Sequence, residues 1–163
     1  MQKLRKALPH AVPSWVADDS RYFITINARQ RGIDTLCCEK RGEALLASIP
    51  VYERADKWFV LAMVVMPDHV HLIASFNRMP GIRAVITSWK SYFAKQLGIE
   101  WQYNFFEHRL RNEDAFTEKL HYVLMNPVRK GLAEAWDQWP HTFVRGSWAK
   151  PSASGPAGTP DPT

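Results

Sequence analysis

Cysteines are few in this sequence, and long apolar runs are absent. The only two cysteines, Cys37 and Cys38, are adjacent, and without a Cys-x-x-Cys pair the usual thiolate zinc sites are excluded. Adjacent cysteines rarely pair with each other, so we expect both thiols to be reduced. No apolar run reaches the roughly 18 residues that a transmembrane helix needs. Pro9 and Pro13 interrupt the basic start where a signal peptide would have its apolar core. The sequence therefore predicts a cytoplasmic protein.

Positive charge exceeds negative charge along the chain. The sequence has 21 Lys and Arg residues against 16 Asp and Glu residues, which gives a formal net charge of +5 at pH 7. Such a balance favours an anionic partner, and nucleic acid is the first candidate. Aromatic residues make up 12% of the chain and could offer stacking platforms for unpaired bases. Composition alone favours a nucleic-acid partner without deciding it.

The composition divides the chain into one domain and two flanking segments. A chain of 163 residues is long enough for a single domain with its own core. We expect an N-terminal extension at 1–18, a folded domain at 19–148, and a disordered tail at 149–163. The tail consists almost entirely of Pro, Gly, Ser, Ala and Thr, which cannot bury enough apolar surface to offset the cost of ordering.

The order of predicted elements indicates an α+β fold. Segments rich in β-branched and aromatic residues predict strands at 21–29, 57–66, 69–76 and 101–111. Helical spacing of apolar residues predicts helices within 38–57, at 79–98, and from Asn112 to Asn126, where Pro127 should end the last helix. This order predicts a ferredoxin-like antiparallel sheet with packed helices.

A His-Val-His triplet begins the third predicted strand, which should be central in the sheet, directly after a Pro-Asp turn signal. Residues i and i+2 of a strand project from the same face, so His69 and His71 should stand side by side while Val70 points the other way. Two such imidazoles can share one divalent metal ion. They could instead be a solvent-facing pair beside a turn, and the triplet alone leaves both interpretations open.

The last predicted helix places a phenol, an amide and two cations along one edge. Tyr122 lies at the border of the buried stripe, and its nearest neighbours on the helical wheel are Lys119, Asn126 and Arg129. If this edge faces the histidines, a metal held by them and the Asn126 oxygen could polarise a phosphodiester, and Tyr122 could attack the phosphorus. The alternative is that Tyr122 is a border core residue with its hydroxyl in water.

Two long motifs in the chain carry a family resemblance. "MPDHVHL" at 66–72 and "YVLMNPVRKGL" at 122–132 resemble the two signatures of the single-tyrosine HUH transposases. They are closest to those of the REP-associated tyrosine transposases, which act on repetitive extragenic palindromes. The resemblance covers about residues 20–135 and includes "YFITIN" at 22–27.

The resemblance implies an enzyme and assigns roles to residues of this chain. It implies a metal-dependent endonuclease and strand transferase that cuts single-stranded DNA beside a hairpin and forms a 5′-phosphotyrosine at Tyr122. His69 and His71, with Asn126 as the third ligand, would hold Mg²⁺ or Mn²⁺. We further assign DNA phosphate binding to Lys119, Arg129, Lys130, Arg83 and Lys90. A monomer is expected, with a dimer as the alternative.

Two other functions are alternatives for the same residues. A nucleic-acid-binding protein without turnover could keep the histidines and the tyrosine as scaffold. A two-histidine phosphoesterase would need two separate His-x-Ser/Thr motifs, and the sequence has none. The presence of His69, His71, Tyr122 and Asn126 together favours the enzyme.

Overall fold

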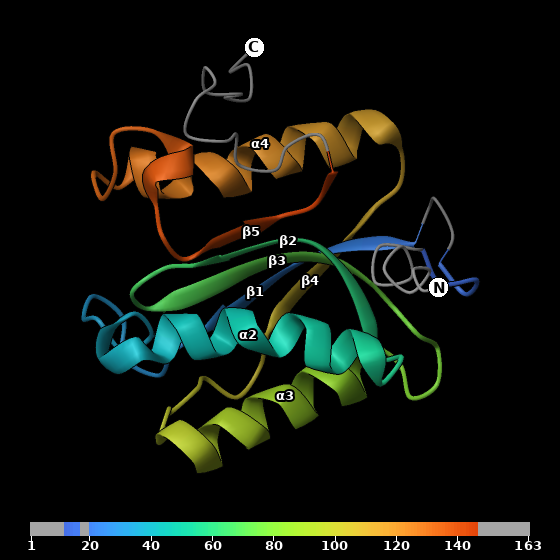
Figure 1. Ribbon diagram of the computed structural model, residues 1–163, viewed down its shortest axis with the longest axis horizontal. Helices are drawn as coiled ribbons and strands as arrows, with labels where there is room; N and C mark the ends of the chain where they lie inside the picture. Colours follow the sequence, from blue (N-terminus) through green and yellow to red (C-terminus); the bar gives the residue numbers. More distant parts are fainter. Residues whose placement is uncertain (1–11, 17–19, 147–163) are drawn as a thin grey trace, which may run out of the picture.

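The computed structural model describes residues 12–16 and 20–146 (Figure 1). Its strands are β1 (Arg21–Asn27), β2 (Trp58–Val65), β3 (His69–Phe76), β4 (Phe106–Leu110) and β5 (Thr142–Val144). Its α-helices are α2 (Arg41–Arg54), α3 (Ile82–Leu97) and α4 (Glu113–Arg129), and two short 3-10 turns are Cys38–Lys40 and Trp136–Gln138. The predicted tail at 149–163 and most of the predicted extension at 1–18 lie outside the described residues.

The five strands form one antiparallel sheet. Their order across the sheet is β4-β1-β3-β2-β5, and every paired neighbour is antiparallel. The first four strands in this order have the arrangement of a ferredoxin-like sheet, so the predicted fold class is confirmed. β3, which begins at His69, is the middle strand and is flanked by β1 and β2.

Helices cover both faces of this sheet. Figure 1 shows α4 on one face and α2 and α3 on the other. Because side chains alternate along a strand, β1 contributes Ile24 to the core under α2 and α3 but Phe23 to the core under α4. In the first core, Trp58 and Trp89 are fully buried, and burial of a side chain of this size contributes about 2 kcal/mol or more.

Backbone hydrogen bonds within the hairpin, and from the segment that follows β1, hold the turn between β2 and β3. The Met66 N–H donates to the His69 carbonyl at 2.8 Å, and the Ala28 N–H donates to the Asp68 carbonyl at 2.9 Å. The Pro67 carbonyl accepts from Thr35 and Leu36 at 2.8 and 2.9 Å. These bonds fix the point at which β3 begins, and so they fix which face the histidines occupy.

Helix α4 begins as predicted but continues past its predicted end. The Asn112 side chain accepts from the Ala115 N–H at 2.8 Å, as an N-cap should. The prediction that the helix ends at Asn126 is wrong, because Pro127 sits within its last turn. A proline there has a φ near the helical value, and only one carbonyl loses its partner.

The true end of α4 is a glycine turn. Gly131 has a φ of +74°, and the Leu132 N–H donates to the Pro127 carbonyl at 2.8 Å. Asn126 therefore stays helical, four residues after Tyr122, and both side chains remain on the same edge of the helix.

Other elements differ from the sequence-based expectation in extent. Residues 101–105 are not part of a strand, although Trp101 forms an isolated bridge with Ala28. Strand β5, which pairs with β2, was not predicted, and a three-residue strand gives little periodic signal. Among the residues that the structure describes, no helix has the length and apolarity to cross a membrane.

Candidate active site

The two histidines of the triplet lie together on the face of the sheet that α4 covers. Ile73, two residues after His71 on the same side of β3, belongs to the core under α4. The His69 and His71 ring centroids are 4.6 Å apart. Only 6% and 5% of these residues is exposed, so they are not a solvent-facing pair.

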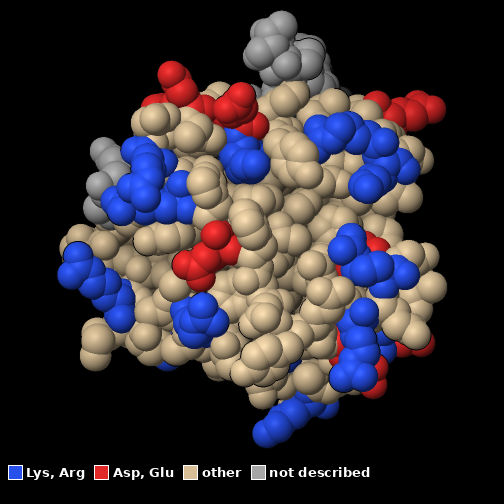
Figure 2. All heavy atoms as spheres, turned by 180° about the vertical axis from the view of Figure 1, so that it is seen from behind, with Lys and Arg blue, Asp and Glu red and all other residues tan. Residues whose placement is uncertain are grey.

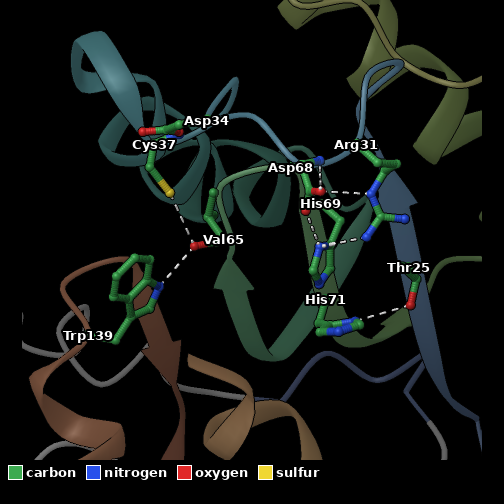
Figure 3. Close-up of polar contacts among 10 residues, drawn as sticks. Thr25, Arg31, Asp34, Cys37, Val65, Asp68, His69, His71 and Trp139 are labelled. Carbon is green, nitrogen blue, oxygen red and sulfur yellow. Dashed lines mark hydrogen bonds and ion pairs between the residues drawn. The ribbon is translucent and has the colours of Figure 1, made fainter. Parts of the chain in front are cut away.

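Each imidazole is oriented by a hydrogen bond at its Nδ1 atom (Figure 3). His69 Nδ1 lies 2.8 Å from Asp68 Oδ1, and His71 Nδ1 lies 3.1 Å from Thr25 Oγ1. A carboxylate only accepts, so His69 carries its proton on Nδ1, and its Nε2 presents a lone pair. With its proton on Nδ1, His71 donates to Thr25 and presents Nε2 in the same way. This is the usual arrangement behind metal-ligating histidines.

Burial keeps both imidazoles in the neutral form that binds metals. Burial, followed by the charges of His69, Lys119 and Arg129, lowers the pKa of His71 to about 3. Burial also lowers the pKa of His69, although Asp68 opposes this effect. At neutral pH neither ring has to lose a proton before it can ligate a cation.

Asp68 is itself held in the charged form by the loop after β1. Partial burial acts to raise the pKa of its carboxyl, but hydrogen bonds from Arg31, the Gly32 backbone N–H and His69 outweigh burial and lower the pKa well below the usual range. Arg31 Nε donates to Asp68 Oδ2 at 2.9 Å, and the Gly32 N–H donates to the same oxygen at 2.8 Å. The Asp68 carboxylate therefore stays negatively charged beside His69 Nδ1.

Tyr122 projects from α4 beside the histidines. Its ring centroid is 5.8 Å from that of His71 and 6.4 Å from that of Phe23, and 42% of the residue is exposed. Lys119 Nζ lies 4.9 Å from the centroid of the Tyr122 ring, and Arg129 Cζ lies 4.3 Å from it. The phenol is thus accessible, adjacent to the histidine pair, and surrounded by positive charge.

Asn126 supplies an oxygen that has no protein partner. The residue is 3% exposed, and its Oδ1 atom is buried without a hydrogen bond. A buried acceptor left unpaired costs about 1–3 kcal/mol, and a cation would remove that cost. Within the described chain, no three His, Cys, Asp or Glu residues could hold a metal ion together. Two imidazoles and this amide oxygen are a donor set that fits a divalent cation.

No family model matches the sequence, but comparison with known proteins finds relatives. A REP-associated tyrosine transposase of Escherichia coli K12 is 29% identical over 130 residues, which is 76% of each chain. A Haemophilus influenzae protein named in the same way is 29% identical over 99 residues, 50% of this chain and 56% of that one. A solved REP-associated tyrosine transposase bound to a REP hairpin has a TM-score of 0.67, is 25% identical, and matches 81% of each chain.

This chain resembles the REP-associated tyrosine transposases in sequence and in fold. The resemblance indicated by the two motifs is thereby confirmed.

The five basic residues assigned to phosphate binding fall into two groups. Lys119 and Arg129 lie close enough to His71 to lower its pKa, and Lys130 acts on His69 in the same way. Lys130 also lines a cavity of about 230 Å³ together with Arg31 and His69. Arg83 and Lys90 lie on α3, which packs under the other face of the sheet, and they line a different cavity.

Several residues of the site are not predicted by the sequence. In the sequence, Asp68 indicates only a turn, and Thr25 and Asn27 stand in an ordinary strand pattern. Asn27 is the register partner of His69 on β1, and its Oδ1 is also buried without a hydrogen bond. Arg31 gave no signal, since a loop arginine in a basic chain is unremarkable. Only strand pairing shows that these side chains converge.

Proposed function

We propose that this chain is a metal-dependent strand transferase that cleaves single-stranded DNA next to a hairpin and holds the cut strand on Tyr122 as a 5′-phosphotyrosine. The observation that carries the proposal is the position of the Tyr122 ring, 5.8 Å from His71 and one turn before Asn126. A structural tyrosine needs neither a buried histidine pair nor an unpaired amide oxygen beside it. A nucleophile that attacks next to a cation needs both.

The transfer step conserves the number of phosphodiester bonds. The Tyr122 oxygen forms a bond to phosphorus, and the bond from phosphorus to the 3′ oxygen breaks. One fragment of the strand leaves with a 3′-hydroxyl, and the other stays on Tyr122 through its 5′-phosphate. The phenol loses its proton as this bond forms, and the 3′ oxygen gains one. Attack by a 3′-hydroxyl reverses the step, so strands can be rejoined without ATP. Lys119 and Arg129, which lie over the ring, stabilise the negative charge on the phenolate and the phosphate.

His69, His71 and Asn126 would hold Mg²⁺ or Mn²⁺. When bound, the ion would act as a Lewis acid on the scissile phosphate. The protein's own part is to keep both imidazoles neutral and to fix their orientation through Asp68 and Thr25. Arg31 stabilises that arrangement through its bond to Asp68.

Hairpin DNA is the proposed partner. The solved relative is described as bound to a REP hairpin, and this chain has a net charge of +5. Figure 2 shows Lys and Arg side chains spread around the margin of one face, with fewer Asp and Glu side chains among them. Contacts between such cations and DNA phosphates would position a nucleic acid without reading its sequence. We propose that the protein acts as a monomer in the cytoplasm.

A covalent-adduct assay tests the proposal. The full chain is incubated with labelled single-stranded DNA that carries a short hairpin, with Mg²⁺, Mn²⁺ or EDTA. We expect a protein–DNA adduct that survives SDS, forms with either metal, and is absent with EDTA. Hairpin binding without any adduct would refute the transferase and leave a nucleic-acid-binding protein without turnover.

The carboxylate behind His69 gives a graded test of the metal site. Replacing Asp68 by Asn removes the charge that orients and polarises His69 but keeps the size of the side chain. We expect Mn²⁺ affinity, or the rate of adduct formation at limiting Mn²⁺, to fall about 10–100-fold. Calorimetric titration of Mn²⁺ measures the first quantity directly.

The matched control is Asp56→Asn. Asp56 is exposed, follows α2, and has a φ of +58°, which asparagine accepts. Mn²⁺ affinity should be unchanged in this variant. Equal Mn²⁺ affinity for Asp68→Asn and the parent chain would contradict the role assigned to the carboxylate.

A further inference from the structure

A second cavity lies between α3 and the segment that leads into β4. Its volume is about 490 Å³, within the range of about 300–1,000 Å³ that is usual for ligand sites. Three of its lining residues are basic and three are aromatic: Arg29, Arg83, Lys90, Trp101, Tyr103 and Phe105. We call this cavity the α3 groove. None of the residues assigned to the catalytic chemistry lines it.

The wall of the α3 groove is preformed. Lys90 Nζ donates to the carbonyls of Gln102 and Tyr103 at 2.8 and 2.9 Å. In return the Trp101 Nε1–H donates to the Lys90 carbonyl at 3.0 Å, and the Trp101 ring lies 5.6 Å from the ring of Trp89 in the core. A ligand would therefore meet a fixed surface and would not have to order a loop.

Aromatic and basic groups lie together on this surface, with one acidic residue, Glu100, whose Oε1 atom is 3.9 Å from Arg29 Nε. The Tyr103 residue is 94% exposed, and no contact with another described residue holds its ring. Phe105 is partly buried, with Arg83 Cζ at 5.6 Å and Lys90 Nζ at 6.0 Å from its ring centroid. Aromatic faces beside a row of cations suit unpaired nucleotides, which offer a flat base and a phosphate at each step. Duplex DNA, with its bases stacked inside, could use only the cations.

The α3 groove is joined directly to the histidine end of the sheet. The Gln102 N–H donates to the Asn27 carbonyl at 2.9 Å, and the Arg29 N–H donates to the Glu100 carbonyl at 2.8 Å. Asn27 in turn is the register partner of His69. One strand spacing, about 4.8 Å, thus separates the backbone of His69 from the strand that anchors the groove. Because the groove lies beside α3, on the face of the sheet opposite the histidines, a DNA strand from the active site would reach it by passing around this end of β1.

We propose that the α3 groove binds the unpaired nucleotides that flank the DNA hairpin. Their bases stack on Tyr103 and Phe105, and Arg29 and Arg83 bind their phosphates. The inference rests on the proposed function, because that function supplies the DNA, but it assigns a new site and a new role. Exposed aromatic side chains in the groove, rather than the catalytic residues, would sense whether a single-stranded extension is present.

Binding measurements with EDTA present test this inference without any cleavage. Two labelled hairpins are compared, one blunt and one with a short single-stranded extension that carries 2-aminopurine. We expect the full chain to bind the extended hairpin more tightly and to quench the 2-aminopurine by stacking. In Tyr103→Ala, affinity for the extended hairpin should fall about 10-fold or more, and affinity for the blunt hairpin should stay within about twofold.

Two controls separate stacking from other effects. Tyr92→Ala removes a half-exposed tyrosine of α3 that does not line the groove, and it should leave both affinities unchanged. Arg83→Ala should weaken binding of the extended hairpin and reduce its dependence on salt, whereas Tyr103→Ala should leave the salt dependence unchanged.

Equal affinity of the parent chain for the two hairpins would overturn the inference. So would a Tyr103→Ala variant that loses affinity for both equally. Because these readouts need no catalysis, they are independent of the adduct assay: a chain that forms no adduct can still show the preference for the extended hairpin. The two experiments therefore distinguish a chain without strand-transfer activity from a groove that does not bind unpaired nucleotides.

Discussion

Replacing Tyr122 by Phe should abolish the covalent protein–DNA adduct. The substitution removes only the hydroxyl, and the ring keeps its edge-on contacts with His71 and Phe23. It also keeps the cations of Lys119 and Arg129 over its face. Loss of a nucleophile costs about 10⁴-fold or more in enzymes that act through a covalent intermediate. We therefore expect no adduct above background, with hairpin affinity within about twofold of the parent chain.

Tyr92→Phe is the control for this experiment. Tyr92 is a half-exposed tyrosine on α3, remote from the histidine pair, and its loss of a hydroxyl should leave adduct formation unchanged. An adduct of undiminished yield in Tyr122→Phe would show that another residue is the nucleophile. Mass spectrometry of the trapped adduct would then identify that residue.

Replacing His71 by Ala should remove both metal binding and strand transfer. Loss of a residue that only orients a ligand costs about 10–100-fold in metal affinity or activity, so loss of a ligand should cost more than about 100-fold. The change also leaves the Thr25 hydroxyl without its partner and removes a ring that packs on Phe23. Adduct formation and Mn²⁺ binding should therefore be lost together. Thermal unfolding should show only a modest loss of stability.

His108→Ala is the matched control. His108 is exposed on β4 and is the register partner of Phe23, so it lies on the same sheet but outside the histidine pair. Its removal should change neither Mn²⁺ affinity nor adduct yield. Undiminished Mn²⁺ affinity in His71→Ala, with the chain still folded, would refute the assignment of the ligands.

The short-range features of the site were readable from the sequence. The period of two in β3 placed His69 and His71 on one face, and the helical period placed Asn126 one turn after Tyr122. These relations follow from backbone geometry alone. The same local geometry predicts the wrong end for α4, because the usual effect of a proline on the preceding residue does not include the packing of the last turn. Asn126 and Pro127 are both buried, and this burial holds them in the helix.

Contacts between residues far apart in the chain determine how these features of the site come together. Thr25 meets His71 because β1 pairs with β3 in one particular register, and Arg31 meets Asp68 because the loop after β1 folds over the hairpin. Neither contact leaves a trace in local periodicity. The same holds for the α3 groove, since Lys90 and Tyr103 become neighbours only when the segment before β4 docks on α3.

The sequence by itself determined which groups this protein can use: two imidazoles on one face, a phenol and an amide on one helical edge, and a surplus of cations. Local geometry sets such relations within a few residues. Only the tertiary structure decided that the phenol stands beside the imidazoles, that their Nδ1 atoms are taken by Thr25 and Asp68, and that Arg83 and Lys90 line a separate groove. These facts depend on strand register and on the side of the sheet that each helix covers, which are set by contacts between residues far apart in the chain.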